Sequence, residues 1–257
     1  MIIVPDIFDS SKRRVARAKI HIHDLKGKVD PFLKDNPCSL VVEPDTDGIN
    51  NLHKIKFNAV IPDSFGEIAA DALENLRAAL DQAGYAVAVA AGANDPRSAY
   101  FPIGDDATNL EGIIKGGCKQ IPNEIVSLFR TFEPYQGGNE LIWALNKANN
   151  INKHRLLVPA CVSLAQMNFS IHGSGGSGCY IPPPAWDRGK NEIVFAIVAT
   201  DVEKLQYDLK GTYCISFGEI EVLGGYPATD ILNAMASEVE SIVMATEAEA
   251  RRIGLVV

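Results

Sequence analysis

The sequence has no hydrophobic run long enough to cross a membrane. Its longest apolar stretch, residues 83–93, is mostly Ala and Val, well short of the roughly 18–20 residues that a transmembrane helix needs. The first residues, Met-Ile-Ile-Val-Pro-Asp, lack the basic start of a secretory signal. We therefore expect no membrane-spanning segment and a cytoplasmic protein.

Cysteine is scarce, and metal-binding spacings are missing. The chain has 5 cysteines and no Cys-x-x-Cys pair, which argues against a zinc ribbon or a thioredoxin-like site and for thiols in a reducing compartment. His21 and His23 are two positions apart, about 200° around a helix, whereas a zinc-binding helix spaces its histidines by four. We predict no metal and no cofactor. The cysteines are Cys38, Cys118, Cys161, Cys179 and Cys214.

The glycine-rich segment 172–178 also lacks the features of a catalytic or phosphate-binding loop. No Gly-Lys-Ser/Thr follows it, prolines occupy 182–184, and the chain has no G-x-S-x-G motif. We interpret it as a hairpin loop whose flanking strands pair with each other.

Acidic residues outnumber basic ones, 32 to 24, for a net charge of -8. This balance argues against nonspecific coating of nucleic acid. Residues 10–35 nevertheless carry 8 Lys and Arg against 3 Asp, and 5 of the 8 lie between Lys12 and Lys19. Two interpretations stay open: a local basic face that binds RNA or an acidic partner, or a solvated helix face.

Apolar residues recur every three or four positions along several segments, which predicts amphipathic helices. Runs rich in Val, Ile and Phe between them predict strands. Because the two do not alternate strictly, we predict an α+β fold: a bundle of long helices with an antiparallel sheet inserted before the C-terminal helix, in one compact domain, 1–257. The helical ranges are 9–35, 64–92, 121–155 and 229–253, and the β-rich ranges are 38–61 and 156–221.

Local signals place several element ends. Ser64 and Glu67 match a capping box, and Asn139 is placed to cap a helix. Pro31 falls inside the first helical pattern and predicts a kink or a stop there. Residues 45–48, Asp-Thr-Asp-Gly, predict the turn of a strand pair.

One polar cluster stands out as a candidate site. Residues 146–155 concentrate asparagines, cations and His154 at the end of an apolar-striped helix. Lys153 and Arg155 flank His154, and like-charge repulsion favours the neutral imidazole that a general base needs. The cations could hold a phosphate. Alternatively, this is a polar helix end whose cations complement the helix dipole.

The second helix offers a partner set. Asn75, Arg77 and Asp81 lie close together on it, and Arg77 and Asp81 have the i,i+4 spacing of an ion pair. The alternative interpretation is an ordinary surface pair that contributes a few tenths of a kcal/mol.

Residues 75–81 (Asn-Leu-Arg-Ala-Ala-Leu-Asp) and 150–155 (Asn-Ile-Asn-Lys-His-Arg) resemble uncharacterised bacterial proteins with the same two-helix pattern. More loosely, they resemble the HEPN superfamily of helical bundles, many of them metal-independent RNases in toxin and defence systems. That superfamily separates an Arg from a later His by four to six residues, where this chain holds Lys147, Ala148 and Asn149. The resemblance implies a general base at His154 acting on a ribose 2′-hydroxyl, and an active site formed across a homodimer.

These observations support two main hypotheses. The first is an RNA-binding or metal-independent RNase-like module with His154 as general base. Its catalytic residues are His154, Lys147 and Asn150, and its binding residues are Asn149, Lys153, Arg155, Asn75, Arg77 and Asp81. The second is a non-catalytic interaction or scaffold protein whose polar cluster only caps a helix. A weaker third is a small-ligand protein with aromatic residues at the sheet–helix interface: Phe169, Tyr180, Trp186 and Phe195.

Overall fold

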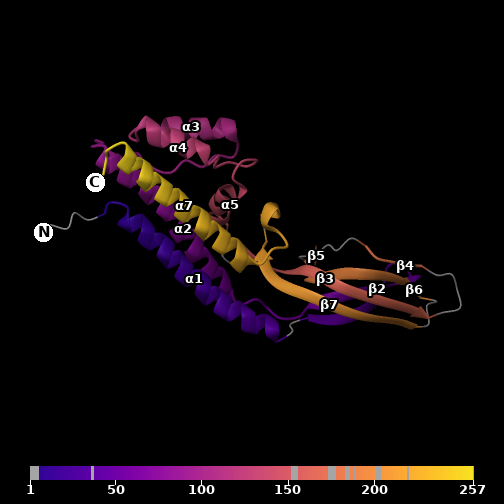
Figure 1. Cartoon of the computed structure of the whole chain (residues 1–257). Coiled ribbons are helices and arrows are strands. Elements are labelled where there is room, and N and C mark those ends of the chain that lie inside the picture. Colours follow the sequence, from indigo (N-terminus) through magenta and orange to yellow (C-terminus); the bar gives the residue numbers. More distant parts are fainter. Residues whose placement is uncertain are drawn as a thin grey trace.

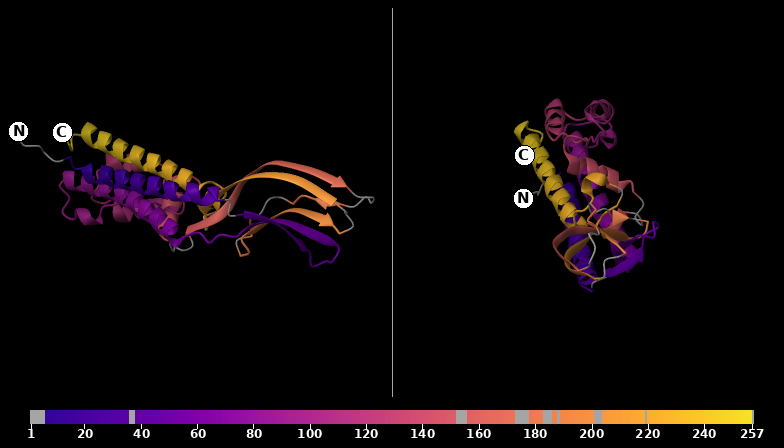
Figure 2. Two further views of the ribbon diagram at one scale, coloured as in Figure 1. Left: turned by 90° about the horizontal axis from the view of Figure 1, so that it is seen from below. Right: turned by 90° about the vertical axis from the view of Figure 1, so that its right-hand side faces the viewer.

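The computed structural model describes residues 6–35, 38–151, 156–172, 178–182, 186–187, 189–200, 204–218 and 220–256. They form an elongated molecule with helices at one end and strands projecting from the other (Figure 1). A view at right angles shows the same end-to-end arrangement (Figure 2). We call these regions the helical bundle (all the α-helices) and the β extension (all the β-strands). The predicted α+β fold with an antiparallel sheet between helices is confirmed.

The bundle is built on the long helices α1 (Asp9–Lys34), α2 (Asp63–Ala90) and α7 (Ala228–Arg252). Each buries its predicted apolar stripe, and Leu25, Leu76 and Leu232 are all 0% exposed. These helices run alongside one another (Figure 1). Three of the predicted helical ranges, 9–35, 64–92 and 229–253, are therefore confirmed to within two residues at each end. α1 continues through Pro31 and ends at Lys34.

The predicted capping box at the start of α2 is wrong. Pro62 occupies the N-cap position, and the helix begins one residue before Ser64 with no side-chain cap. Ser64 therefore lies inside the first turn, where its backbone is helical and its side chain no longer faces the free N–H groups that an N-cap serves.

Shorter helices complete the bundle: α3 (Ala107–Gly117), α4 (Asn123–Thr131) and α5 (Glu140–Asn149). Asn139 caps α5 as predicted, since its Oδ1 accepts from the N–H of Ile142 at 3.2 Å. The helical range 121–155 thus contains α4 and α5. Residues 150–151 are not helical, and 152–155 lie outside the described residues.

The main sheet joins two segments that are distant in sequence. Strands β1 (Cys38–Pro44) and β2 (Asn50–Phe57) form the predicted hairpin, with Gly48 in its turn at φ 73°. β2 then pairs with β6 (Glu192–Ala199), which also pairs with β4 (Cys179–Tyr180) and β5 (Trp186–Asp187). Among the described strands, β1 lies at one edge of the order β1-β2-β6-β4.

The long strands β3 (Leu157–His172) and β7 (Lys204–Phe217) pair with each other in a separate two-stranded ribbon. The predicted hairpin around 172–178 is therefore wrong, because its flanking strands do not pair: β3 pairs with β7, and β4 with β6. Strands that are neighbours in the sequence usually pair. Here β3 pairs with β7 and β4 pairs with β6, and local sequence does not encode this arrangement.

One continuous core fills the bundle and reaches the base of the ribbon through Leu157, Ile215 and Phe217. The extension buries its own smaller set, which includes Ile55, Ile193 and Phe195. The number of domains stays a prediction, although the described regions are extended end to end rather than gathered into one compact unit (Figure 2). Among the described helices, none has the length and apolar character of a membrane span.

Candidate functional site

Arg77 and Asp81 form the predicted pair on α2, and together they hold a neighbouring backbone. Arg77 Nη1 lies 2.9 Å from Asp81 Oδ1. Arg77 Nη2 donates to the carbonyl of Phe101 at 3.1 Å, and the N–H of Phe101 donates to Asp81 Oδ1 at 3.2 Å. The pair therefore satisfies both backbone groups of a residue that is itself 0% exposed.

Burial shifts the pKa of both members of this pair. It raises the pKa of Asp81 against the opposing effect of Arg77, and it lowers the pKa of Arg77 against the opposing effect of Asp81. Each charge thus depends on the other, as expected for a pair that is partly removed from water. The pair differs from an isolated surface ion pair in that it also holds the backbone of Phe101.

An open groove lies beside this pair, with a volume of about 480 Å³. It combines a carboxylate, an amide, a guanidinium and two phenols, so it offers both donors and acceptors. Asp81 and Tyr85 reach it from one face of α2, as their i,i+4 spacing allows. Sequence reasoning missed the groove because its other side comes from a loop after α2. The lining residues are Asp81, Gln82, Tyr85, Arg97, Ala99 and Tyr100.

Asn75, the third predicted member on α2, is buried and hydrogen-bonded. Its Oδ1 accepts from Arg14 Nη1 at 3.0 Å, and its Nδ2 donates to the carbonyl of Asp71 at 2.7 Å. It therefore ties α1 to α2 instead of facing the groove.

At the end of α5, the predicted residues are engaged in local contacts. Lys147 Nζ lies 2.7 Å from Asp105 Oδ1 and 5.7 Å from the centre of the Trp143 ring. Asn150 Nδ2 donates to the carbonyl of Asn146 at 2.9 Å, and Asn149 is exposed. Lys153, His154 and Arg155 lie outside the described residues.

The two predicted sets meet on one segment, residues 99–105. Arg77 and Asp81 of α2 hold it at Phe101, and Lys147 of α5 holds it at Asp105. The structure therefore brings α2 and α5 polar residues to a common segment, where they act as its anchors.

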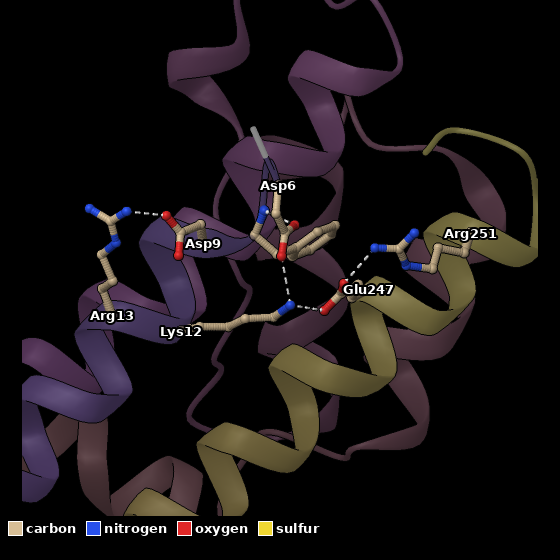
Figure 3. A network of polar contacts seen from close by, with 7 residues as sticks. Asp6, Asp9, Lys12, Arg13, Glu247 and Arg251 are labelled. Carbon is tan, nitrogen blue, oxygen red and sulfur yellow. Dashed lines mark hydrogen bonds and ion pairs between the residues drawn. The ribbon is translucent and has the colours of Figure 1, made fainter. Parts of the chain in front are cut away.

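Cations of the basic run in α1 pair with acids that lie before this helix, within it and on α7. Lys12 lies 2.8 Å from Asp6 and 2.6 Å from Glu247, and Glu247 also binds Arg251 of α7 at 2.9 Å (Figure 3). The hydrogen bond from Lys12 lowers the pKa of Asp6. Arg13 pairs with Asp9, and Lys19 lies 2.7 Å from Glu240. Much of the positive charge in this run is therefore balanced within the protein.

The β extension contains a second buried ionic group, which no sequence motif predicted. Lys54 of β2 is 5% exposed and lies 2.7 Å from Glu43 of β1 and 2.9 Å from Glu192 of β6. Hydrogen bonds to Glu43 and then Glu192 raise the pKa of Lys54. One ammonium thus links three adjacent strands, and we call this group the strand clamp.

The outer edge of β1 presents both apolar side chains and backbone groups. The N–H of Asp45 donates to the carbonyl of Asn50 at 2.8 Å, so these two residues form a hydrogen-bonded pair. Hydrogen-bonded and non-hydrogen-bonded pairs alternate along an antiparallel ladder, so Leu40 and Val42 of β1 belong to non-hydrogen-bonded pairs with β2. This alternation directs the N–H and C=O of Leu40 and Val42 away from β2. Their side chains are 53% and 50% exposed.

Burial raises the pKa of Cys118 to about 11, so this cysteine is a protonated thiol near neutral pH rather than a thiolate nucleophile. Within the described ranges, no three or more His, Cys, Asp or Glu side chains are grouped to hold a metal ion.

Comparisons of the chain with models of protein families, with curated proteins and with solved structures found no match.

Proposed function

We propose that this protein is a non-catalytic interaction protein whose β extension receives an extended partner strand along β1. The observation that carries the proposal is the outer edge of β1, where Leu40 and Val42 combine outward backbone groups with half-exposed aliphatic side chains. Edge recognition of this kind takes affinity from main-chain hydrogen bonds and specificity from alternate side chains.

The composition of β1 supports the same function. Proteins usually protect an edge strand with lysine, a bulge or proline. β1, Cys-Ser-Leu-Val-Val-Glu-Pro, has no lysine, its register with β2 is unbroken, and its proline stands at the end. The strand clamp holds the hairpin against β6, so the edge is preorganised and less entropy is lost when a partner binds.

The engaged polar residues of the bundle also favour a non-catalytic function. Arg77, Asp81 and Lys147 anchor residues 99–105, and Asn75 joins two helices. We retain the cytoplasm as the expected compartment. RNA binding by the basic run is the less favoured alternative, because Lys12, Arg13 and Lys19 are ion-paired.

A display library of random extended heptapeptides tests the proposal. We expect the wild-type protein to enrich peptides with alternating apolar residues. Val42→Pro removes an outward N–H without touching the β2 ladder, and we expect it to lose this binding by roughly tenfold or more. Val60→Pro is the matched control at an 88% exposed position outside the strands, and it should bind like wild type.

Two outcomes would contradict the proposal. One is that no peptide binding depends on residue 42 and the chain also fails to pair with itself through β1. The other is cleavage of mixed RNA by the wild-type protein that His154→Ala abolishes, which would instead establish the RNase-like function.

A further inference from the structure

We propose that the strand received by β1 is β1 of a second copy of this chain, paired antiparallel about a twofold axis through Val41. This inference rests on the proposed function and specifies its partner. In this register, Leu40 of each copy lies opposite Val42 of the other.

The backbone suits such pairing. Residues 40 and 42 direct their N–H and C=O outward, so each Leu40–Val42 pair across the axis is a hydrogen-bonded pair that exchanges two bonds. Pro44 has no N–H, so the ladder weakens at that end of each strand, where it would lie opposite Cys38. The pairing therefore covers the length of β1 and stops with it.

The side chains are self-complementary. Opposite residues of an antiparallel pair lie on the same face, so the half-exposed Leu40 and Val42 of both copies would form one aliphatic strip. A register shifted by two residues would pair Leu40 with Leu40 but oppose Val42 to Cys38, or pair Val42 with Val42 but oppose Leu40 to Pro44. Among these three registers, the chosen one alone gives both exposed aliphatic residues of each copy an exposed aliphatic partner.

The charge on β1 is compatible with the register that pairs Leu40 with Val42. Glu43 is the one charged residue of β1, and it lies opposite Ser39 of the other copy rather than opposite a second Glu43. Its carboxylate is already held 2.7 Å from Lys54, and that contact lowers the pKa of Glu43. No like charges therefore face each other along the paired strands, a condition that pairing requires.

The contact is small. Two paired seven-residue strands fall below the roughly 1,200 Å² of a standard stable interface. We therefore expect a reversible dimer with a dissociation constant in the micromolar range or weaker, visible as a concentration-dependent molecular mass.

Disulfide trapping tests the register. Residue 41 would form a non-hydrogen-bonded pair across the axis with Cα atoms about 4.5 Å apart, within the range for a disulfide. We expect Val41→Cys to form a covalent dimer on mild oxidation at least about tenfold faster than Ser39→Cys. The residues at position 39 on the same face would be about 14 Å apart. Equal rates, or a faster reaction of Ser39→Cys, would overturn the register.

Sedimentation equilibrium tests the association without new cysteines. We expect a monomer–dimer equilibrium for wild type and Val60→Pro, and a monomer at all concentrations for Val42→Pro. A wild-type chain that stays monomeric would overturn self-pairing. If that monomer still selects peptides that need Val42, the proposed function stands and only the partner is wrong. If it selects none, both are wrong.

Discussion

The helical bundle and the β extension each hold a largely buried basic side chain against acidic groups, Asp81 in the bundle and Glu43 and Glu192 in the extension, with different results. In the bundle, Arg77 and Asp81 serve the backbone of Phe101 within the same fold. In the extension, Lys54 links Glu43 and Glu192 across three strands, and β1 lies at one edge of the described sheet. The Arg77–Asp81 pair thus fixes the segment 99–105 within the bundle, whereas the strand clamp holds an edge strand, β1, in the extension.

The hydrophobic cores of the helical bundle and the β extension also differ. The bundle packs several helices around one continuous core, whereas the buried side chains described in the main sheet of the extension, such as Ile55, Ile193 and Phe195, lie outside that core. Because stability follows buried apolar area, we expect the bundle to be the more stable region.

The largest expected effect comes from breaking the strand clamp. Lys54→Ala leaves Glu192 buried without its cation, which should destabilise the β extension by about 2–3 kcal/mol. The double variant Lys54→Met/Glu192→Gln removes both charges and should recover much of this loss. Lys56→Ala, two residues along β2 at a half-buried position, is the control.

Denaturant unfolding with two probes measures this effect. Trp186 lies on β5 and Trp143 on α5, so Trp186 fluorescence in a Trp143→Phe background follows the extension while circular dichroism follows the bundle. Equal destabilisation by Lys54→Ala and Lys56→Ala would show that the clamp has no special role.

The next prediction, with a smaller expected change in stability, compares the two ion pairs that anchor residues 99–105, Arg77–Asp81 and Lys147–Asp105. Arg77 is 17% exposed and Asp81 38%, whereas Lys147 and Asp105 are 44% and 68% exposed. We expect Arg77→Met to destabilise the bundle by about 1–2 kcal/mol, because the partly solvated pair is screened, and Lys147→Met by no more than about 0.5 kcal/mol. Amide exchange at Phe101 should rise in the first variant only. A larger effect of Lys147→Met would reverse the comparison.

The smallest expected effect is a pH dependence of the unfolding free energy that is confined to the β extension. His53 is buried and packs edge-on against Phe195 at 6.2 Å, and burial lowers the pKa of His53 below its ordinary 6.5. The unfolded chain therefore takes up the proton first. The stabilisation is complete above about pH 6.5 and is lost as the pH falls through the folded-state pKa, at no more than about 1.4 kcal/mol per pH unit.

Unfolding experiments between pH 7.5 and 5 check this prediction. We expect His53→Gln to flatten the pH dependence of the extension, and the exposed His23→Gln to leave it as in wild type. An unchanged slope in His53→Gln would assign the pH dependence to other groups.

The sequence predicted those features that depend on neighbours in the chain. The apolar spacing of α1, α2 and α7, the Asn139 cap and the turn at 45–48 were all correct, because each is decided within a few residues. The capping box failed by one residue, since Pro62 starts α2 earlier. The hairpin at 172–178 failed because strand pairing compares distant segments.

The candidate sites show the same limit. The Arg77–Asp81 pair follows from its i,i+4 spacing, but its ligand, the backbone of Phe101, does not. Sequence spacing also could not predict that Lys54 meets Glu192, 138 positions away. For His154, no described contact bears on the predicted role.

Local periodicity, composition and turn chemistry therefore determined the elements of this protein and their amphipathic faces, because those properties are encoded within a turn of helix or a pair of strand residues. The tertiary structure alone decided which strands pair, which charges are buried and which strand lies at the edge of the described sheet. Those outcomes depend on long-range packing, in which segments distant in the chain compete for the same neighbours and for the same removal from water.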